Sequence, residues 1–145
     1  MLIVIIGESC TGKSTLAENL KDRLNATVYT GKDYLRLAKN ESIAGKLFEK
    51  QLREAVAGGN MIYVIAEKEH LQLVPQGAVR VLMTADLELI QERFALRMRG
   101  PLPPPVKQML EKKHGCFDEE SYDYHIHNSQ DWEAVAESIV MGGSA

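Results

Sequence analysis

This chain is organised around the stretch Gly7-Glu-Ser-Cys-Thr-Gly-Lys-Ser-Thr15. The stretch has the spacing G-x-x-x-x-G-K-[ST], with an uninterrupted aliphatic run, residues 2–6, directly before it and a helical pattern directly after it. Glycines allow the backbone to curl so that its N–H groups point inward, and the N-terminus of the following helix adds a positive dipole end. The stretch therefore indicates a strand, an anion-binding loop and a helix in succession, and the alternative is a coincidental glycine turn.

The residue types of this loop indicate how it would hold a nucleotide. Lys13 would reach the β- and γ-phosphates, and the hydroxyl of Ser14 would be a ligand for Mg²⁺. All of the loop is predicted to contact the nucleotide, namely Gly7, Glu8, Ser9, Cys10, Thr11, Gly12, Lys13, Ser14 and Thr15. We therefore expect ATP with Mg²⁺ at this end of the chain.

Length and composition predict one domain. With 145 residues, of which 45% are hydrophobic and 26% charged, the chain can form one domain with a sizeable core, at residues 1–145. A formal net charge of −3 argues against nucleic-acid binding through a basic face. The two cysteines suit a reducing cytosol, and residues 2–6 are too short for a signal peptide or a membrane span. We expect a cytoplasmic protein without nucleic-acid or membrane partners, and a homodimer stays open.

Strand and helix patterns alternate along the chain. Strands are predicted over residues 2–6, 26–29, 61–66, 78–83 and 124–127, and helices over 14–24, 42–57, 87–98, 106–114 and 131–141. Shorter helical turns are expected near 34–39 and in the connection 68–77. This alternation predicts an α/β fold, a doubly wound parallel five-stranded sheet flanked by helices in three layers.

A short basic insert interrupts the alternation. Arg93 and Arg97 lie four residues apart on one helix, Arg99 follows at its end, and a proline cluster then breaks the chain. We interpret residues 97–118 as a lid that folds over the nucleotide, with Arg93 beside the nucleotide. Guanidinium groups that arrive on closure would stabilise the charge of a transferred phosphoryl group and exclude water. The alternative is a solvated helix face whose arginines pair with neighbouring acids.

Taken together, these elements resemble the superfamily of nucleoside monophosphate kinases and of shikimate and gluconate kinases. The resemblance rests on the phosphate loop, on Asp33-x-x-Arg36 after the second strand, and on the R-x-x-x-R-x-R ending of the helix before the insert. The tail from Tyr122 to Asn128 is similar to the end of guanylate and cytidylate kinases, where a strand ends in Asn beside the adenine of ATP. The resemblance spans nearly the whole chain.

The resemblance implies roles for residues outside the loop. It makes Arg97 and Arg99 the donors of the lid, and it places Asn128 beside the adenine. It makes Asp33 the group that orients or deprotonates an acceptor, and Arg36 the group that holds an anion on that acceptor. The alternative for Asp33 is a cap on the helical turns that follow it.

Glu67 stands where adenylate kinases would have D-G-x-P-R after the third strand. It would hold a water of Mg²⁺, or it is an exposed glutamate at a strand end. The GTPase motifs D-x-x-G and N-K-x-D do not occur in the sequence. We therefore expect Mg-ATP-dependent phosphoryl transfer to a small-molecule acceptor, a nucleotide, a nucleoside or an anionic metabolite. The alternatives are a nucleotide-binding regulatory module and a P-loop ATPase or GTPase without an acceptor.

Overall fold

The computed structural model describes residues 1–143, so positions 144–145 of the predicted domain lie outside the described residues. The strands are β1 (Leu2–Gly7), β2 (Thr27–Thr30), β3 (Met61–Ile65), β4 (Val79–Thr84) and β5 (Tyr124–His127). The helices are α1 (Lys13–Leu24), α2 (Glu41–Ala57), α3 (Leu87–Met98), α4 (Pro104–Lys113) and α5 (Trp132–Gly143), with the 3₁₀ segments η1 (Asp33–Leu37) and η2 (Lys68–Leu73). Every predicted strand and helix is present, with ends shifted by at most two residues. Within residues 1–143, none of the helices has the length and apolar character needed to cross a membrane.

The strands form one parallel sheet in the order β2-β3-β1-β4-β5. β1 is central and buried along its whole length, which explains why its sequence is aliphatic without alternation. The edge strands β2 and β5 are short and largely exposed. The predicted α/β fold with a doubly wound five-stranded parallel sheet is confirmed.

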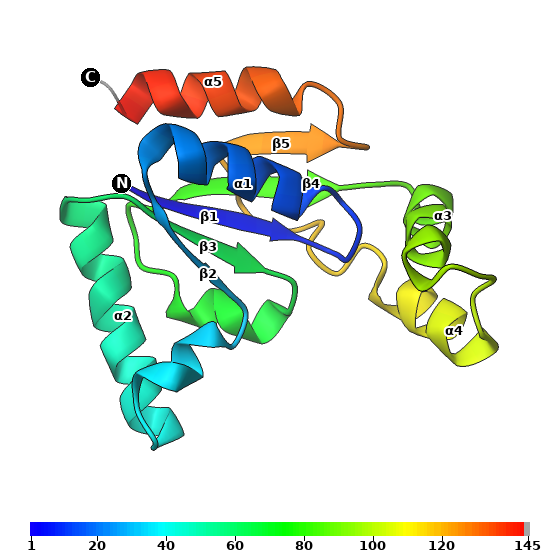
Figure 1. Cartoon of the computed structure of the whole chain (residues 1–145), viewed down its shortest axis with the longest axis horizontal. Helices are drawn as coiled ribbons and strands as arrows, with labels where there is room; N and C mark the ends of the chain where they lie inside the picture. The colour runs from blue at the N-terminus through cyan, green and yellow to red at the C-terminus, as the bar shows by residue number, and fades with distance from the viewer. Residues whose placement is uncertain (144–145) are drawn as a thin grey trace.

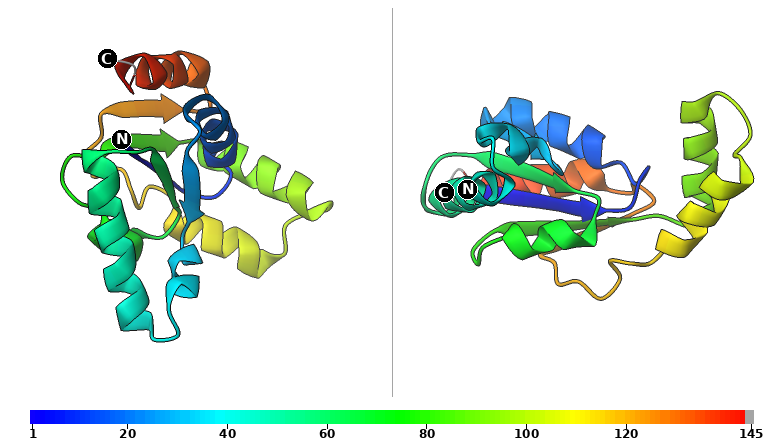
Figure 2. Two further views of the ribbon diagram at one scale, coloured as in Figure 1. Left: turned by 60° about the vertical axis from the view of Figure 1, so that its left-hand side comes forward. Right: turned by 90° about the horizontal axis from the view of Figure 1, so that it is seen from below.

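Right-handed crossovers decide which face of the sheet each helix covers. The chain moves from β1 to the edge strand β2, reverses direction, and then adds β3, β4 and β5 in turn. The reversal places α1 on one face and α2 on the other, and α5 returns to the face of α1 (Figures 1 and 2). The result is the predicted arrangement of three layers.

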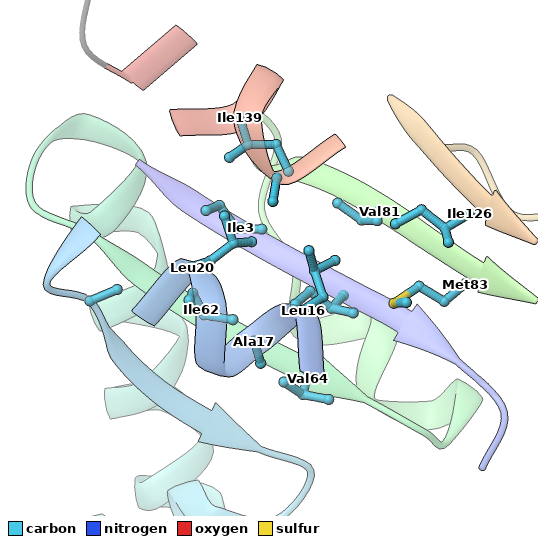
Figure 3. Close-up of a cluster of buried hydrophobic side chains, with 13 residues drawn as sticks. Ile3, Leu16, Ala17, Leu20, Ile62, Val64, Val81, Met83, Ile126 and Ile139 are labelled. Carbon is cyan, nitrogen blue, oxygen red and sulfur yellow. The ribbon is translucent and has the colours of Figure 1, made fainter. Parts of the chain in front are cut away.

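Helix α1 lies on the sheet through the apolar positions that the sequence predicts. Leu16 and Leu20 are fully buried, and Figure 3 shows their side chains directed at the sheet beside Ile3 of β1. Ile139 of α5 belongs to the same cluster. On the opposite face Phe48 of α2 packs against the buried strands. These two clusters hold the carboxyl ends of β1, β3 and β4 at one edge, where the loops of the site begin.

Helices α3 and α4 form a pair that projects beyond the carboxyl ends of the strands (Figure 1; Figure 2, right). Ile90 of α3 and Leu110 of α4 are buried in one small cluster with Cys10 and Ala85. The insert predicted over residues 97–118 is therefore part of a helical arm that packs on the phosphate loop. We use the name lid for this arm, residues 87–118, which begins with α3 and so starts ten residues before the predicted lid.

Candidate active site

The predicted phosphate loop forms the turn between β1 and α1. Cys10 and Gly12 have positive φ values of 63° and 97°, so the backbone curls back on itself there. A Cβ atom on Gly7 would lie 2.4 Å from the carbonyl oxygen of Met83, and one on Gly12 would lie 2.8 Å from Ser129 Oγ. The two glycines of the motif therefore allow the loop to lie between β4 and the segment after β5.

The start of α1 is arranged for an anion. Its first turn carries no acidic residue, and among the described residues no side chain caps its N-terminus. Free N–H groups and the positive end of the helix dipole together favour a bound phosphate. Ser14 and Thr15 are exposed at this turn, so the Ser14 hydroxyl is accessible to a cation held by the same phosphates.

Lys13 is a buried cation, with 9% of its surface exposed. Its Nζ donates a hydrogen bond of 2.6 Å to the carbonyl oxygen of Glu8, which also accepts one of 2.9 Å from Thr11 Oγ1. The pKa of Lys13 is lowered from 10.5 to about 8, mainly because burial disfavours the charged ammonium, and the nearby charge of Arg97 is a smaller contribution in the same direction. A negative ligand beside Lys13 would oppose both effects, so the loop gains from binding an anion.

The carboxylate of Glu8 joins the phosphate loop to the end of α4. Its Oε1 lies 3.2 Å from His114 Nδ1, and its Oε2 accepts a hydrogen bond of 3.1 Å from Gly115 N. The side chain is therefore engaged by the lid, and the backbone N–H is the group that Glu8 can offer to a phosphate. Sequence reasoning missed His114, because the two residues are 106 positions apart and no local pattern connects them.

The lid also contacts the phosphate loop through Arg93 and Cys10. Arg93 Nη1 donates a hydrogen bond of 2.9 Å to the carbonyl oxygen of Cys10. The side chain of Cys10 packs among Ile90 and Leu110 of the lid. The backbone of Cys10 thus forms part of the phosphate loop, while its side chain packs against the lid. Arg93 contacts the edge of the loop, where we predicted a bound nucleotide.

The remaining lid arginines lie in different surroundings. Arg97 is exposed, one helical turn after Arg93, and is close enough to Lys13 to lower its pKa. Arg99 ends α3 with a positive φ of 59° and lines a surface hollow with Leu96 and Pro101. The structure therefore brings Arg97 toward the phosphate loop, whereas the role predicted for Arg99 requires the end of α3 to rearrange.

Glu67, at the carboxyl end of β3, is paired with the lid. Its Oε1 accepts a hydrogen bond of 2.6 Å from Lys113 Nζ at the end of α4. Among residues 1–143 no group of three His, Cys, Asp or Glu side chains could hold a metal ion. Beside nucleotides, Mg²⁺ is commonly held by one or two protein oxygens, by phosphate oxygens and by water, and the exposed hydroxyl of Ser14 fits such a role. A contact of Glu67 with one of those waters stays a prediction.

Asp33 follows β2 at the same edge of the sheet and is exposed. Its Oδ2 accepts a hydrogen bond of 2.9 Å from Thr30 N, so the side chain closes the turn behind it, and η1 has no side-chain cap among the described residues. The alternative in which Asp33 caps the following helical turns is therefore wrong. Arg36 lies over the ring of Tyr29, with its guanidinium carbon 5.4 Å from the ring centroid.

The segment after β5 lies against both the phosphate loop and the lid. Asn128, predicted beside the adenine, accepts a hydrogen bond of 2.8 Å from Asp86 N and donates one of 2.9 Å to Asp86 Oδ2. The bond from Asn128 is also the main reason why the pKa of Asp86 is lowered. Ser129, which sequence reasoning missed, lies with its Oγ 3.4 Å from the carbonyl oxygen of Thr11. Asn128 therefore fixes the start of α3 beside the loop.

Comparison with solved structures supports the fold predicted from the sequence. The chain is similar to shikimate kinase from Acinetobacter baumannii in complex with shikimate (TM-score 0.64, 14% identity, 97% of this chain and 93% of that chain). It is similar to a sugar kinase from Janibacter sp. (TM-score 0.63, 17%, covering 97% and 92%). It is also similar to the YorR protein of Bacillus subtilis in complex with phosphorylated GDP (TM-score 0.64, 22%, covering 99% and 96%).

These similarities define the class of fold. No protein-family model and no curated protein matches the sequence significantly. The chain nevertheless has the P-loop kinase fold along nearly its whole length, as in the shikimate, gluconate and sugar kinases. The resemblance stated from the motifs is thus confirmed at the level of the fold.

Proposed function

We propose that this protein transfers the γ-phosphoryl group of Mg-ATP to a hydroxyl group of a small-molecule acceptor. The observation that carries the proposal is the surroundings of Lys13. A buried ammonium, with its pKa lowered to about 8, lies at the N-terminus of a helix that no side chain caps among the described residues, and an arginine of the lid is near enough to influence it. Such a site is built for several negative charges at once, as in a triphosphate.

The proposed roles follow from where the elements meet. The backbone of residues 7–15 would bind the phosphates, Lys13 would neutralise their charge, and Ser14 would hold Mg²⁺. Arg97 would stabilise the charge of the moving phosphoryl group, and Arg99 would join it if the end of α3 turns inward. Asp33, which follows a different strand of the same edge, would orient or deprotonate the acceptor hydroxyl.

The neighbours in structure support an acceptor of low molecular weight. The similar structures include a shikimate kinase bound to shikimate, a gluconokinase and a sugar kinase. The YorR protein was solved with a phosphorylated GDP, which supports nucleotide binding on this fold. All of them share less than 25% identity with this chain, so their substrates do not identify its acceptor, which has to be found by experiment.

A coupled ADP-release assay tests the proposal. Mg-ATP is supplied with single members of a panel of nucleoside monophosphates, nucleosides, sugars, amino sugars, shikimate and gluconate. The protein should release ADP faster with at least one acceptor, and Lys13→Ala should abolish that increase without changing the melting temperature by more than a few degrees.

The other outcomes separate the alternatives. Tight ATP binding without acceptor-dependent turnover would contradict the proposal and indicate a regulatory nucleotide-binding module. Turnover that no acceptor changes would indicate an ATPase, and a preference for GTP in that case would indicate a GTPase.

A further inference from the structure

A hollow of about 520 Å³ lies between η1, α2 and η2, and Asp33 itself is not among the residues that line it. Lys32 and Tyr34, the two neighbours of Asp33 in sequence, both line this hollow. Its volume is in the range of about 300–1,000 Å³ that small-molecule sites occupy. If the function proposed above is correct, an acceptor that approaches Asp33 from this side lies in the hollow, which we call the η1–α2–η2 hollow.

The charge of the η1–α2–η2 hollow is negative. Three carboxylates line it, those of Glu41 and Glu49 from α2 and Glu69 from η2, against the single ammonium of Lys32. With His70 neutral, three negative charges and one positive charge leave a formal charge of −2. Among residues 1–143, neither Glu41 nor Glu49 has an ion-pair partner within 4.0 Å.

The arginine that would counter this charge is directed elsewhere. Arg36, which the resemblance assigns to an anionic group of the acceptor, lies over the ring of Tyr29 and does not line the hollow. An anionic acceptor in the hollow would therefore face three carboxylates without an arginine beside it, which is electrostatically unfavourable.

A buried histidine supplies a second, independent indication. His70 lines the hollow with only 4% of its surface exposed, and its Nδ1 has no hydrogen-bond partner among the described residues. The carboxylate of Glu69 lies 3.8 Å from Nε2, which favours the tautomer with its proton at Nε2. Nδ1 then carries a free lone pair, and leaving a buried polar group without a hydrogen-bond partner is destabilising. A ligand that donates a hydrogen bond would satisfy this nitrogen after a turn of the imidazole ring toward the hollow, because Nδ1 itself is buried.

We propose that the acceptor is a hydroxyl-rich compound with no negative charge, either neutral or bearing an ammonium group. Carboxylates and an imidazole lone pair all accept hydrogen bonds, so the lining matches a ligand that presents O–H and N–H donors. In the reaction, the acceptor oxygen bonds to the γ-phosphorus, the bond from that phosphorus to the bridging oxygen breaks, and ADP leaves with the electron pair. The hydroxyl proton passes to the Asp33 carboxylate and then to water. Among the acceptors expected from the sequence, a nucleoside fits this description, and a nucleoside monophosphate or a sugar acid does not.

The test compares acceptors that differ in charge and share a skeleton. Glucosamine, glucose and gluconate form one set, and each nucleoside with its monophosphate forms another, all assayed by ADP release with saturating Mg-ATP. We expect turnover with neutral or ammonium-bearing members and at least about tenfold lower kcat/KM for their anionic counterparts. Turnover confined to anionic acceptors would overturn this inference and leave the proposed kinase function intact. No acceptor-dependent turnover with any compound would overturn both.

Variants of the hollow locate the effect. Glu49→Gln should lower kcat/KM for an ammonium-bearing acceptor by about tenfold, the scale of one lost charge attraction in a half-buried site, with the ATP dissociation constant unchanged. Glu69→Gln should act in the same direction with a smaller effect, because the side chain of Glu69 is exposed and water screens its charge. The matched control is Glu54→Gln, also on α2, because Glu54 pairs with Lys50 at 4.0 Å outside the hollow. Unchanged acceptor kinetics in both hollow variants, or equal losses in the control, would contradict the assignment of the hollow.

Discussion

Raising the pH above 8 should weaken ATP binding, because Lys13 then loses its proton. In the folded chain, burial lowers the pKa of Lys13 to about 8, so the free protein carries a charged ammonium below this pH and a neutral amine above it. A bound triphosphate stabilises the charged form, so the complex keeps the proton. Above the pKa, binding therefore requires the uptake of one proton, and affinity falls as pH rises.

The size of the effect follows from a single titrating group. The apparent dissociation constant is multiplied by the ratio of total to protonated free protein, which rises about tenfold between about pH 7 and about pH 9 for a pKa near 8. That factor corresponds to about 1.4 kcal/mol of binding free energy. At about pH 6 the constant should differ little from its value at pH 7, since Lys13 is already protonated there.

Isothermal titration calorimetry with Mg-ATP in two buffers of different ionisation enthalpy measures both quantities. We expect uptake of about half a proton at the pKa of Lys13 and of nearly one proton one pH unit higher. Lys13→Arg keeps its charge over this range and should flatten the profile, whereas Lys50→Arg, at an exposed position, should leave it unchanged. A constant affinity from about pH 7 to about pH 9, with no proton uptake in the native chain, would refute this account of Lys13.

Three further predictions concern the loop, the lid and the acceptor side. Gly12→Ala should abolish nucleotide binding, because a Cβ at this position meets Ser129 Oγ at 2.8 Å and φ is 97°. The control Gly58→Ala adds its Cβ to open space and should bind nucleotide normally. Equal binding by the two variants in a nucleotide titration would count against the loop geometry. Arg97→Ala should lower kcat by about 10²–10³ with little change in ATP affinity, and Arg99→Ala should lower kcat less. If both variants have a lower melting temperature and an unchanged kcat, the two arginines have a structural role and take no part in catalysis. Asp33→Asn can still accept the hydrogen bond from Thr30 N, so the melting temperature and ATP affinity should stay near those of the native chain while turnover falls by about 10²–10⁴. Unchanged turnover in Asp33→Asn would leave closure of the turn as its role.

The sequence by itself determined the parts of this protein whose causes are local. The aliphatic run of β1, the glycine spacing of the loop and the apolar face of α1 act within a few residues of one another, so their structures follow from the order of residue types. The same holds for α3, which runs from Leu87 to Met98 as predicted, and for the alternation of strands and helices that leads to a parallel sheet. Element ends differed by a residue or two, because caps and fraying are decided by neighbours that the pattern does not contain.

Only the tertiary structure decided which side chains meet around the phosphate loop. Glu8 pairs with His114, Glu67 with Lys113, and Ser129 lies against Gly12, and each pair joins segments far apart in the chain. The strand order brings those segments together, since crossovers place the ends of β1, β3, β4 and β5 at one edge. The direction of Arg36 onto Tyr29 and the unpaired Nδ1 of His70 are likewise results of packing. The residue types suggested which chemical groups are available. The crossovers between strands decided which of these groups meet, because side-chain contacts depend on distances in space rather than along the chain.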